Sequence, residues 1–361
     1  MKDKSKALLI VVIILVTALI AYVCYGIFRG NKNPIVTMEV SYIDSEGKTK
    51  NGTVKIELYP DSAPETVANF IALANNGYYD GLTFHRIVKD FVVQGGDKNG
   101  DGSGSASYRD LFASYTIKSV ENDKITCENT KTKETKEIKA SDLPEKIKKL
   151  PKEEKEGKIL LYKDGKYQIE DDVDNYTYSI KGEFAANGVN NDVKFGKGII
   201  GMARSDYSSY GLTEEGYNSA SSQFFVVTTD DKASLNSLNQ NYASFGKVIE
   251  GYEFIEEIGK LYSEEADGST NNTSTEITES GEVAENVDGN TEVIPEKSNE
   301  SDEQTEKNVP KTTRVRVDTF GVNYKLPNAL NFDQTLNTIS QYQSFYQQLN
   351  QQYQNGTTEV E

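Results

Sequence analysis

Apolar and polar residues alternate along several short stretches of the chain, the pattern of strands with one buried face. The alternation is clearest in residues 35–40 and 52–58, joined by a hairpin loop, and returns in residues 198–204, 222–227, 243–249 and 314–320. Apolar residues three or four apart instead predict helices over residues 64–74 and 252–259. Ser62 to Glu65, before the first helix, has capping-box spacing. The pattern therefore predicts a mainly β protein with two helices.

The amino-terminal end has a different pattern. Three lysines precede Ala7 to Phe28, a run without charged side chains that at ~1.5 Å per residue is long enough to cross a ~30 Å hydrocarbon core. The charge bias, with only Arg29 and Lys32 following closely, favours a cytoplasmic amino terminus and an extracytoplasmic body. We predict that residues 1–30 form a cytoplasmic stub and a single-pass membrane anchor. A cleaved signal peptide is the alternative, but the run is long for one and no Ala-x-Ala site follows it closely.

Cysteine and histidine are scarce. Cys24 lies within the apolar run and Cys127 far beyond it, so an internal disulfide is implausible. His85 is the only histidine, which leaves no set of histidine and cysteine ligands for zinc. Asp97 to Gly102 matches the first half of a calcium-binding loop, but the twelfth position is Tyr108 where a bidentate glutamate is needed. We expect neither a metal nor another cofactor.

Most of the negative charge is local. The segment 263–308 holds fourteen acidic residues against two lysines, and so carries −12 of the net charge of −17. It is rich in Ser, Thr, Asn and Gly and nearly lacks aromatic residues, a composition that predicts disorder. The remainder is only mildly acidic, which argues against nucleic acid as a partner.

Two segments carry a resemblance to a known family. One runs from Thr83 to Asp97 with the sequence TFHRIVKDFVVQGGD, and the other from Ser222 to Val227 with the sequence SQFFVV. Together they resemble the signature segments of the cyclophilins, the peptidyl-prolyl cis/trans isomerases. The resemblance implies a closed eight-stranded antiparallel β-barrel capped by two helices, and isomerase activity on proline-containing polypeptides.

The resemblance also sets the domain boundaries. In the cyclophilins the last strand pairs near the first, so the isomerase domain should span residues 34–328 and contain two insertions, 105–176 and the acidic segment 263–308. The first insertion has alternating stretches separated by lysine-rich segments; it is either an accessory flap that contacts clients or membrane headgroups, or a solvated hairpin appendage. Residues 329–361 form a Gln-rich tail whose apolar spacing fits an amphipathic helix. A frayed tail fits the same composition.

Ten residues match the family's active site. Arg86 matches the catalytic arginine, and Gln94 the residue that helps to fix the arginine and the substrate backbone. Being eight residues apart, the two would face the same side of a regular strand. Further matches form the walls of the proline pocket (Phe91, Val92, Phe225 and Leu238) and line the substrate groove (Ala203, Arg204, Gln223 and Tyr242). Taken singly, each apolar residue could equally be part of the barrel core.

The chain departs from the animal members of the family along the groove. They have Trp-Leu-Asp-Gly where this chain has Ser237 to Gln240, and histidine at the place of Tyr242, where bacterial relatives often have tyrosine. None of these changes removes Arg86, so the resemblance still implies activity, on exported or cell-surface proteins if the anchor is present. The alternative from another class is a surface binding module that only grips proline-containing segments. The sequence leaves the clients and the oligomeric state open.

Overall fold

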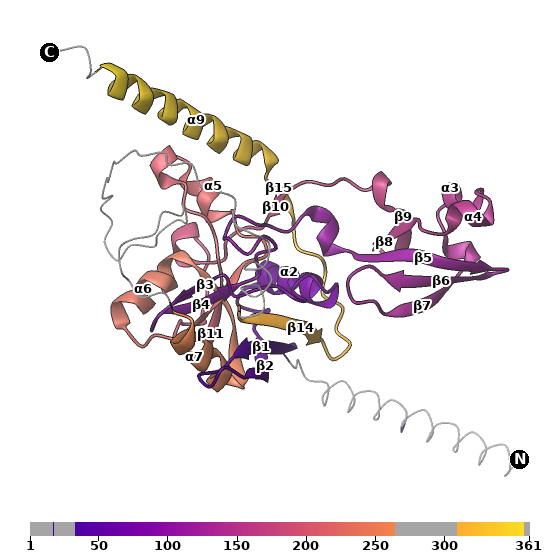
Figure 1. The fold of residues 1–361 in the computed structure, drawn as a ribbon, viewed down its shortest axis with the longest axis horizontal. Helices are drawn as coiled ribbons and strands as arrows, with labels where there is room; N and C mark the ends of the chain where they lie inside the picture. The colour runs from indigo at the N-terminus through magenta and orange to yellow at the C-terminus, as the bar shows by residue number, and fades with distance from the viewer. Residues whose placement is uncertain (1–16, 18–32, 264–308, 357–361) are drawn as a thin grey trace, which may run out of the picture.

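The computed structural model describes residue 17, residues 33–263 and residues 309–356. Two antiparallel sheets contain most of the strands and lie side by side, the larger one with most of the helices around it (Figure 1). The predicted anchor lies outside the described residues except for Thr17, and so does the acidic segment except for Ser263. In the part of the chain that the structure describes, no helix is long and apolar enough to cross a membrane.

The larger sheet has eight antiparallel strands, which confirms the prediction of a mainly β protein. Its last strand pairs with its first, Val36 opposite Val317, as expected from the resemblance. In spatial order the strands are β14 (Lys311–Asp318), β1 (Ile35–Ile43), β2 (Thr49–Leu58), β13 (Ala243–Glu250), β11 (Ile199–Met202), β12 (Phe224–Val227), β4 (Val92–Gly95) and β3 (Arg86–Val88).

The prediction of a closed barrel is wrong in one respect. The strand order has two ends, β3 and β14, so the sheet is a curled half-barrel without a continuous ladder. The ends approach each other where residues 81–84, just before β3, meet residues 310–312. Thr83 and Lys311 form a bridge there, and three backbone hydrogen bonds join the segments: Gly81 N to the Thr312 carbonyl (2.8 Å), Thr312 N to the Leu82 carbonyl (2.9 Å) and Phe84 N to the Pro310 carbonyl (2.9 Å). The contact goes no farther, because β3 itself has only three residues and pairs with β4 alone.

Both predicted helices are present, α2 (Pro64–Asn75) and α7 (Tyr252–Leu261), and two more follow the sheet strands, α5 (Thr213–Tyr217) and α6 (Lys232–Asn241). Helix α2 inserts Phe70 into the core of the half-barrel. The centroid of its ring lies 4.9 Å from the ring centroid of Tyr79, 5.6 Å from that of Phe224 and 5.4 Å from that of Phe245. All four rings are buried, so the aromatic cluster fixes the helix on the inner face of the sheet.

The predicted capping box at the start of α2 is wrong. The residue before the helix is Ala63, and no side chain from that segment caps it. The buried carboxylate of Glu183 does so from a distant loop, accepting bonds from the backbone N–H groups of Glu65 (3.0 Å) and Thr66 (2.9 Å) and from the Thr66 hydroxyl (2.7 Å). Local spacing could not reveal a cap that lies more than a hundred residues away.

The first insertion folds as a second sheet beside the half-barrel (Figure 1). Its strands, in spatial order, are β7 (Thr135–Lys139), β6 (Lys124–Asn129), β5 (Ala113–Glu121), β8 (Ile159–Lys163) and β9 (Lys166–Ile169). Two short helices, α3 (Glu145–Lys148) and α4 (Lys152–Lys155), lie between β7 and β8. A separate core containing Ile117, Ile125, Cys127 and Leu160 holds it together. The insertion is therefore a small folded unit, larger than a hairpin.

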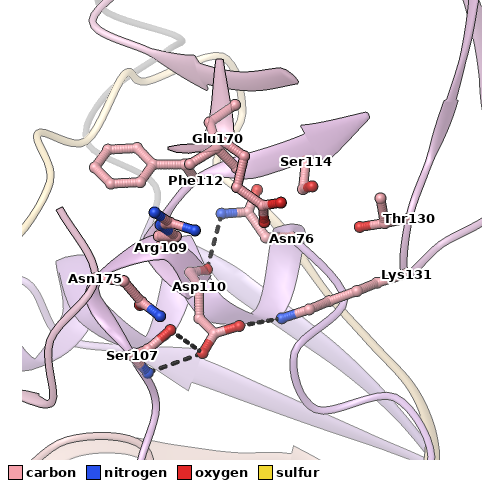
Figure 2. Close-up of a pocket in the computed structure, with 11 residues that line it drawn as sticks. Asn76, Ser107, Arg109, Asp110, Phe112, Ser114, Thr130, Lys131, Glu170 and Asn175 are labelled. Carbon is pink, nitrogen blue, oxygen red and sulfur yellow. Dashed lines mark hydrogen bonds and ion pairs between the residues drawn. The ribbon is translucent and has the colours of Figure 1, made fainter. Parts of the chain in front are cut away.

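The insertion is joined to the half-barrel at a polar base (Figure 2). The rings of Tyr108 and Tyr176 stack 4.7 Å apart, and the Asp110 carboxylate bonds Lys131 Nζ (2.6 Å). Asn76, at the end of α2, donates to the Asp110 carbonyl (3.4 Å). A pocket of about 180 Å³ is lined by Asn76, Asp110 and Lys131 together with their neighbours. Burial alone would raise the pKa of Asp110, but Lys131 and Ser107 outweigh it and hold that pKa below its ordinary value.

The carboxyl-terminal segment is packed over its first part. Strand β15 (Leu330–Asn331) pairs with β10 (Tyr178–Ser179), and α9 (Asp333–Gly356) follows and runs past α5 (Figure 1). Phe332 stacks on Tyr207 just before the helix begins, Ile339 is buried and Tyr342 stacks on Tyr210, whereas Phe345 farther along is 56% exposed. The remaining short turns are 3₁₀ helices: η1 (Tyr108–Leu111), η2 (Ala140–Asp142), η3 (Glu170–Asp172), η4 (Ala185–Asn187) and η5 (Ser208–Tyr210).

Candidate active site

The two candidate catalytic residues face each other across a strand pair. Arg86 on β3 is the direct partner of Gln94 on β4, and Gln94 in turn lies opposite Phe225 on β12. Directly opposed residues project from the same face of a sheet. The prediction that Arg86 and Gln94 share a face because both lie on one regular strand was wrong. The chain turns between β3 and β4, with Asp90 in a left-handed conformation (φ 53°). The shared face therefore comes from cross-strand pairing.

The other face of the same strands belongs to the main core. Val93, Phe224 and Val226 are fully buried there, against the helix α2 side of the molecule. Alternate residues on these strands thus serve two purposes: one set holds the fold together and the other set builds the site. The site is therefore attached directly to the main core.

Polar side chains on the site face are connected by hydrogen bonds. Arg86 Nη1 donates to Gln94 Oε1 at 3.3 Å, and Gln94 Nε2 donates to Gln223 Oε1 at 2.9 Å. All three side chains are partly buried. The structure therefore brings together the predicted catalytic pair and one predicted groove residue in a single network.

The predicted apolar residues gather beside this network. Val92, Phe225 and Leu238 are buried in one cluster, and three more of the predicted residues, partly buried, pack against it: Phe91, Ala203 and Tyr242. The Phe225 and Tyr242 rings meet edge to face at 5.5 Å. Leu238 comes from α6, which closes this side of the cluster. Residues from four separate segments thus form one apolar cluster, and its member Phe225 shares a sheet face with Gln94 and Arg86.

Sequence reasoning missed several members of the cluster, chief among them Phe195. Its ring stacks on Phe225 with centroids 5.7 Å apart. Gly201 makes this stacking possible, because a Cβ there would lie 2.4 Å from Phe225 Cζ and 2.8 Å from the Phe195 ring. Phe195 lies in a loop without alternation, so the sequence alone offers no signal for it. Ile199 and Val227 complete the buried set.

Arg204 is held by the protein itself. Its Nε donates to the Asn241 carbonyl (2.8 Å) and its Nη1 to the Ser205 carbonyl (2.9 Å), while the guanidinium lies 5.2 Å from the centre of the Tyr242 ring. Burial raises the pKa of Tyr242, so its hydroxyl stays neutral at physiological pH. Arg204 therefore supports the rim of the apolar cluster.

Next to Arg86, burial lowers the pKa of His85 in spite of the opposing charge of Asp97. The imidazole is therefore neutral at physiological pH, and the positive charge on this part of the site is that of the guanidinium.

Asp97 does not present its oxygens to an ion. The carboxylate is buried and accepts the backbone N–H groups of Asn99 (3.0 Å) and Asp101 (2.9 Å) of its own loop. Over the residues that the structure describes, no three His, Cys, Asp or Glu side chains are grouped as a metal site requires. The pocket of Figure 2 also lies apart from the network, since it shares no lining residue with it.

Comparison with known proteins identifies the family. Residues 42–282 match the family model for cyclophilin type peptidyl-prolyl cis-trans isomerases. A peptidyl-prolyl cis-trans isomerase-like protein of Rhizopus delemar is 54% identical over 66 residues, which are 18% of this chain and 40% of the relative. A peptidyl-prolyl cis-trans isomerase of Schizosaccharomyces pombe is 53% identical over 68 residues, 19% of this chain and 44% of the relative. Each alignment spans less than half of the relative's length.

Among solved structures, a cyclophilin type isomerase of Cryptosporidium parvum, crystallised in the presence of the dipeptide Ala-Pro, is 23% identical. The match covers 60% of this chain and 84% of the other, with a TM-score of 0.31.

Proposed function

The chain belongs to the family of cyclophilin-type peptidyl-prolyl cis-trans isomerases, and from this premise we propose that it catalyses the rotation of X-Pro bonds in polypeptides. The observation that carries the proposal is the paired arrangement of Arg86 and Gln94 beside the apolar cluster. This arrangement offers a charged donor next to a surface that suits a proline ring.

The reaction needs little more than that. Resonance in the amide sets a barrier of roughly 18 to 20 kcal/mol, and no bond is made or broken when the amide twists. In the twisted state the prolyl nitrogen loses conjugation and gains a lone pair, so a donor aimed at that nitrogen stabilises the transition state more than the ground state. Arg86 supplies the donor, because a guanidinium remains charged at any physiological pH. Phe225 and its neighbours hold the ring in place.

The test is exchange spectroscopy by NMR on a short Ala-Pro peptide, with wild type, Arg86→Ala and Arg86→Lys. Removing a preorganised donor should slow catalysis about 10²-fold in Arg86→Ala. Arg86→Lys keeps the charge but loses the planar group that binds Gln94, so it should recover only part of the rate. Equal rates for folded wild type and Arg86→Ala would reject the proposal.

We further propose that the chain is anchored by Ala7 to Phe28, with its amino terminus in the cytoplasm and its catalytic domain outside. The support is the length of the uncharged run and the lysines before it. The clients are then exported or cell-surface proteins.

Protease added to intact cells tests this topology. The domain should be lost, with the first cuts between residues 263 and 308, where the composition favours cleavage. A domain that survives in intact cells but is cut in lysed ones would place it on the cytoplasmic side.

A further inference from the structure

The hydrogen bonds around Arg86 continue beyond the catalytic pair to the backbone of a loop. Gln94 Nε2 donates to Gln223 Oε1 (2.9 Å), and Gln223 Nε2 donates to the carbonyl oxygens of Gly102 (2.8 Å) and Gly104 (3.0 Å). Two glutamine amides in series thus connect the guanidinium to the loop that follows β4.

That loop has little freedom. Asp97, which is 1% exposed, accepts backbone N–H groups from Asn99, Asp101 and Gly102. At Gly104 a Cβ would lie 1.8 Å from Asp97 Oδ1, so only glycine allows the chain to pass this close to the carboxylate. The two carbonyl oxygens that meet Gln223 are therefore held in place from within the loop.

The two ends of this chain of bonds decide the orientation of both amides. Backbone carbonyls can only accept, so they require the nitrogen of the Gln223 amide and turn its oxygen toward Gln94. Gln94 must then direct its nitrogen to Gln223 and its oxygen to Arg86, which can only donate. If Gln223 were flipped, its oxygen would face two carbonyl oxygens, and its nitrogen would face the nitrogen of Gln94.

We propose that Gln223 is a positioning residue, which transmits the fixed polarity of the Gly102 and Gly104 carbonyls through Gln94 and so holds the guanidinium of Arg86 in its orientation for catalysis. This rests on the proposed isomerase function and adds to it a role for a loop that lies beside the reacting groups. The loop also leads directly into the insertion, since Ser107 is already paired with Thr177 at its base.

The test uses the full chain with Gln223→Glu. At pH 8 the carboxylate can still accept from Gln94 but has no donor for either loop carbonyl. Losing these hydrogen bonds should lower kcat about tenfold, with KM changed less than twofold. At pH 4 the protonated acid regains one donor, and the ratio of variant to wild-type kcat should return toward one. Gln223→Met has no donor at either pH and should remain slow at both.

Neighbouring groups also titrate, so each rate is taken as a ratio to wild type at the same pH. Gln223 lies beside His85, whose imidazole is influenced by Arg86, Asp97 and Asp101, and wild type has all four of these groups. Gln334→Glu, an exposed glutamine on α9, is the matched control and should follow wild type at both pH values. A similar loss in this control, or a Gln223→Glu variant as fast as wild type at pH 8, would overturn the proposal.

A measurement without substrate separates this proposal from the proposed function. The side-chain amide signals of Gln94 in ¹⁵N NMR should shift in Gln223→Glu at pH 8 and return at pH 4. If the Gln94 signals shift as expected but wild type shows no isomerase activity, the isomerase function is rejected and the positioning role is not. Unchanged Gln94 signals in an active, folded Gln223→Glu would reject the positioning role alone.

Discussion

The half-barrel and the insertion are both antiparallel sheets with their own cores, and each contains a partly buried cationic side chain. The two side chains differ in the groups that surround them. In the half-barrel, Arg86 bonds a glutamine oxygen beside an apolar cluster. In the insertion, Lys136 Nζ is surrounded by three tyrosine rings, 3.6 Å from the centre of Tyr115, 5.0 Å from Tyr167 and 5.3 Å from Tyr162.

The difference indicates that the charge of Lys136 contributes to packing, whereas the charge of Arg86 is available for catalysis. Rings that surround an ammonium group stabilise it in place and leave no room for a substrate. A guanidinium fixed through an amide keeps its orientation without being enclosed. We therefore expect the half-barrel to carry the catalysis and the insertion to be dispensable for it.

The largest effects should come from the two cores. Ile56→Ala in the half-barrel and Ile125→Ala in the insertion each create a cavity at a fully buried site and should cost about 2 to 5 kcal/mol. Hydrogen exchange should show the loss confined to the sheet that carries the change. Ile56→Ala should also reduce isomerase activity at elevated temperature, whereas Ile125→Ala should not; loss of protection in both sheets from Ile125→Ala would show that they unfold as one unit.

The ion pair near the half-barrel edge comes next. Arg316 on β14 forms two parallel bonds with Asp80 (2.7 and 2.8 Å), and both side chains are largely buried. Arg316→Ala should destabilise the half-barrel by about 1.5 to 3 kcal/mol, because Asp80 is left as a poorly solvated charge. Arg314→Ala, exposed on the same strand, is the control and should leave the denaturant midpoint unchanged. Equal midpoints for the two variants would contradict this account.

The ion pair at the base of the insertion should be weaker and dependent on pH. Because the folded protein holds the pKa of Asp110 below its ordinary value, the stabilisation is complete above the unfolded pKa and is lost as pH falls through the folded pKa. Asp110→Asn should cost the insertion about 1 kcal/mol at pH 7, reduced by the partial exposure of Lys131, and less below pH 4. A difference from wild type that grows on acidification would have the wrong sign.

The smallest effect concerns the tyrosine cage. Lys136→Met keeps the length of the side chain but removes the charge, and should cost about 0.5 to 1 kcal/mol in the insertion. Lys139→Met, exposed on the same strand, should cost nothing measurable in thermal unfolding. If the two variants melt alike, the cage contributes no stability.

The sequence predicted what depends on local pattern. Strands β1 and β2 alternate clearly because one face of each meets the core, and the resemblance supplied Arg86 and Gln94. Helix α6 was missed because Leu238 is its only buried residue, too few for a helical period. Edge strand β7 of the insertion has a single apolar residue, and edge strand β9 has only four residues, too few for their alternation to mark a strand.

The contacts that complete the site depend on tertiary structure. The hydrogen bond between Gln94 and Gln223 joins residues 129 positions apart. Phe195 reaches Phe225 only because Gly201 leaves space between strands. Residue type suggests that such groups can interact, but only the folded chain decides which ones do.

The central claim, that the half-barrel alone carries a catalyst dependent on Arg86, is tested by removing the insertion. Ser107 and Thr177 are bridge partners, so residues 109–175 can be replaced by two glycines without displacing the flanking backbone. The shortened chain loses some packing from Leu111, Phe112 and Leu161 and should be less stable. We predict that its kcat/KM on an Ala-Pro peptide stays within about threefold of wild type and falls about 10²-fold with Arg86→Ala. A folded but inactive shortened chain would contradict the claim, and so would a shortened chain whose kcat/KM is unchanged by Arg86→Ala.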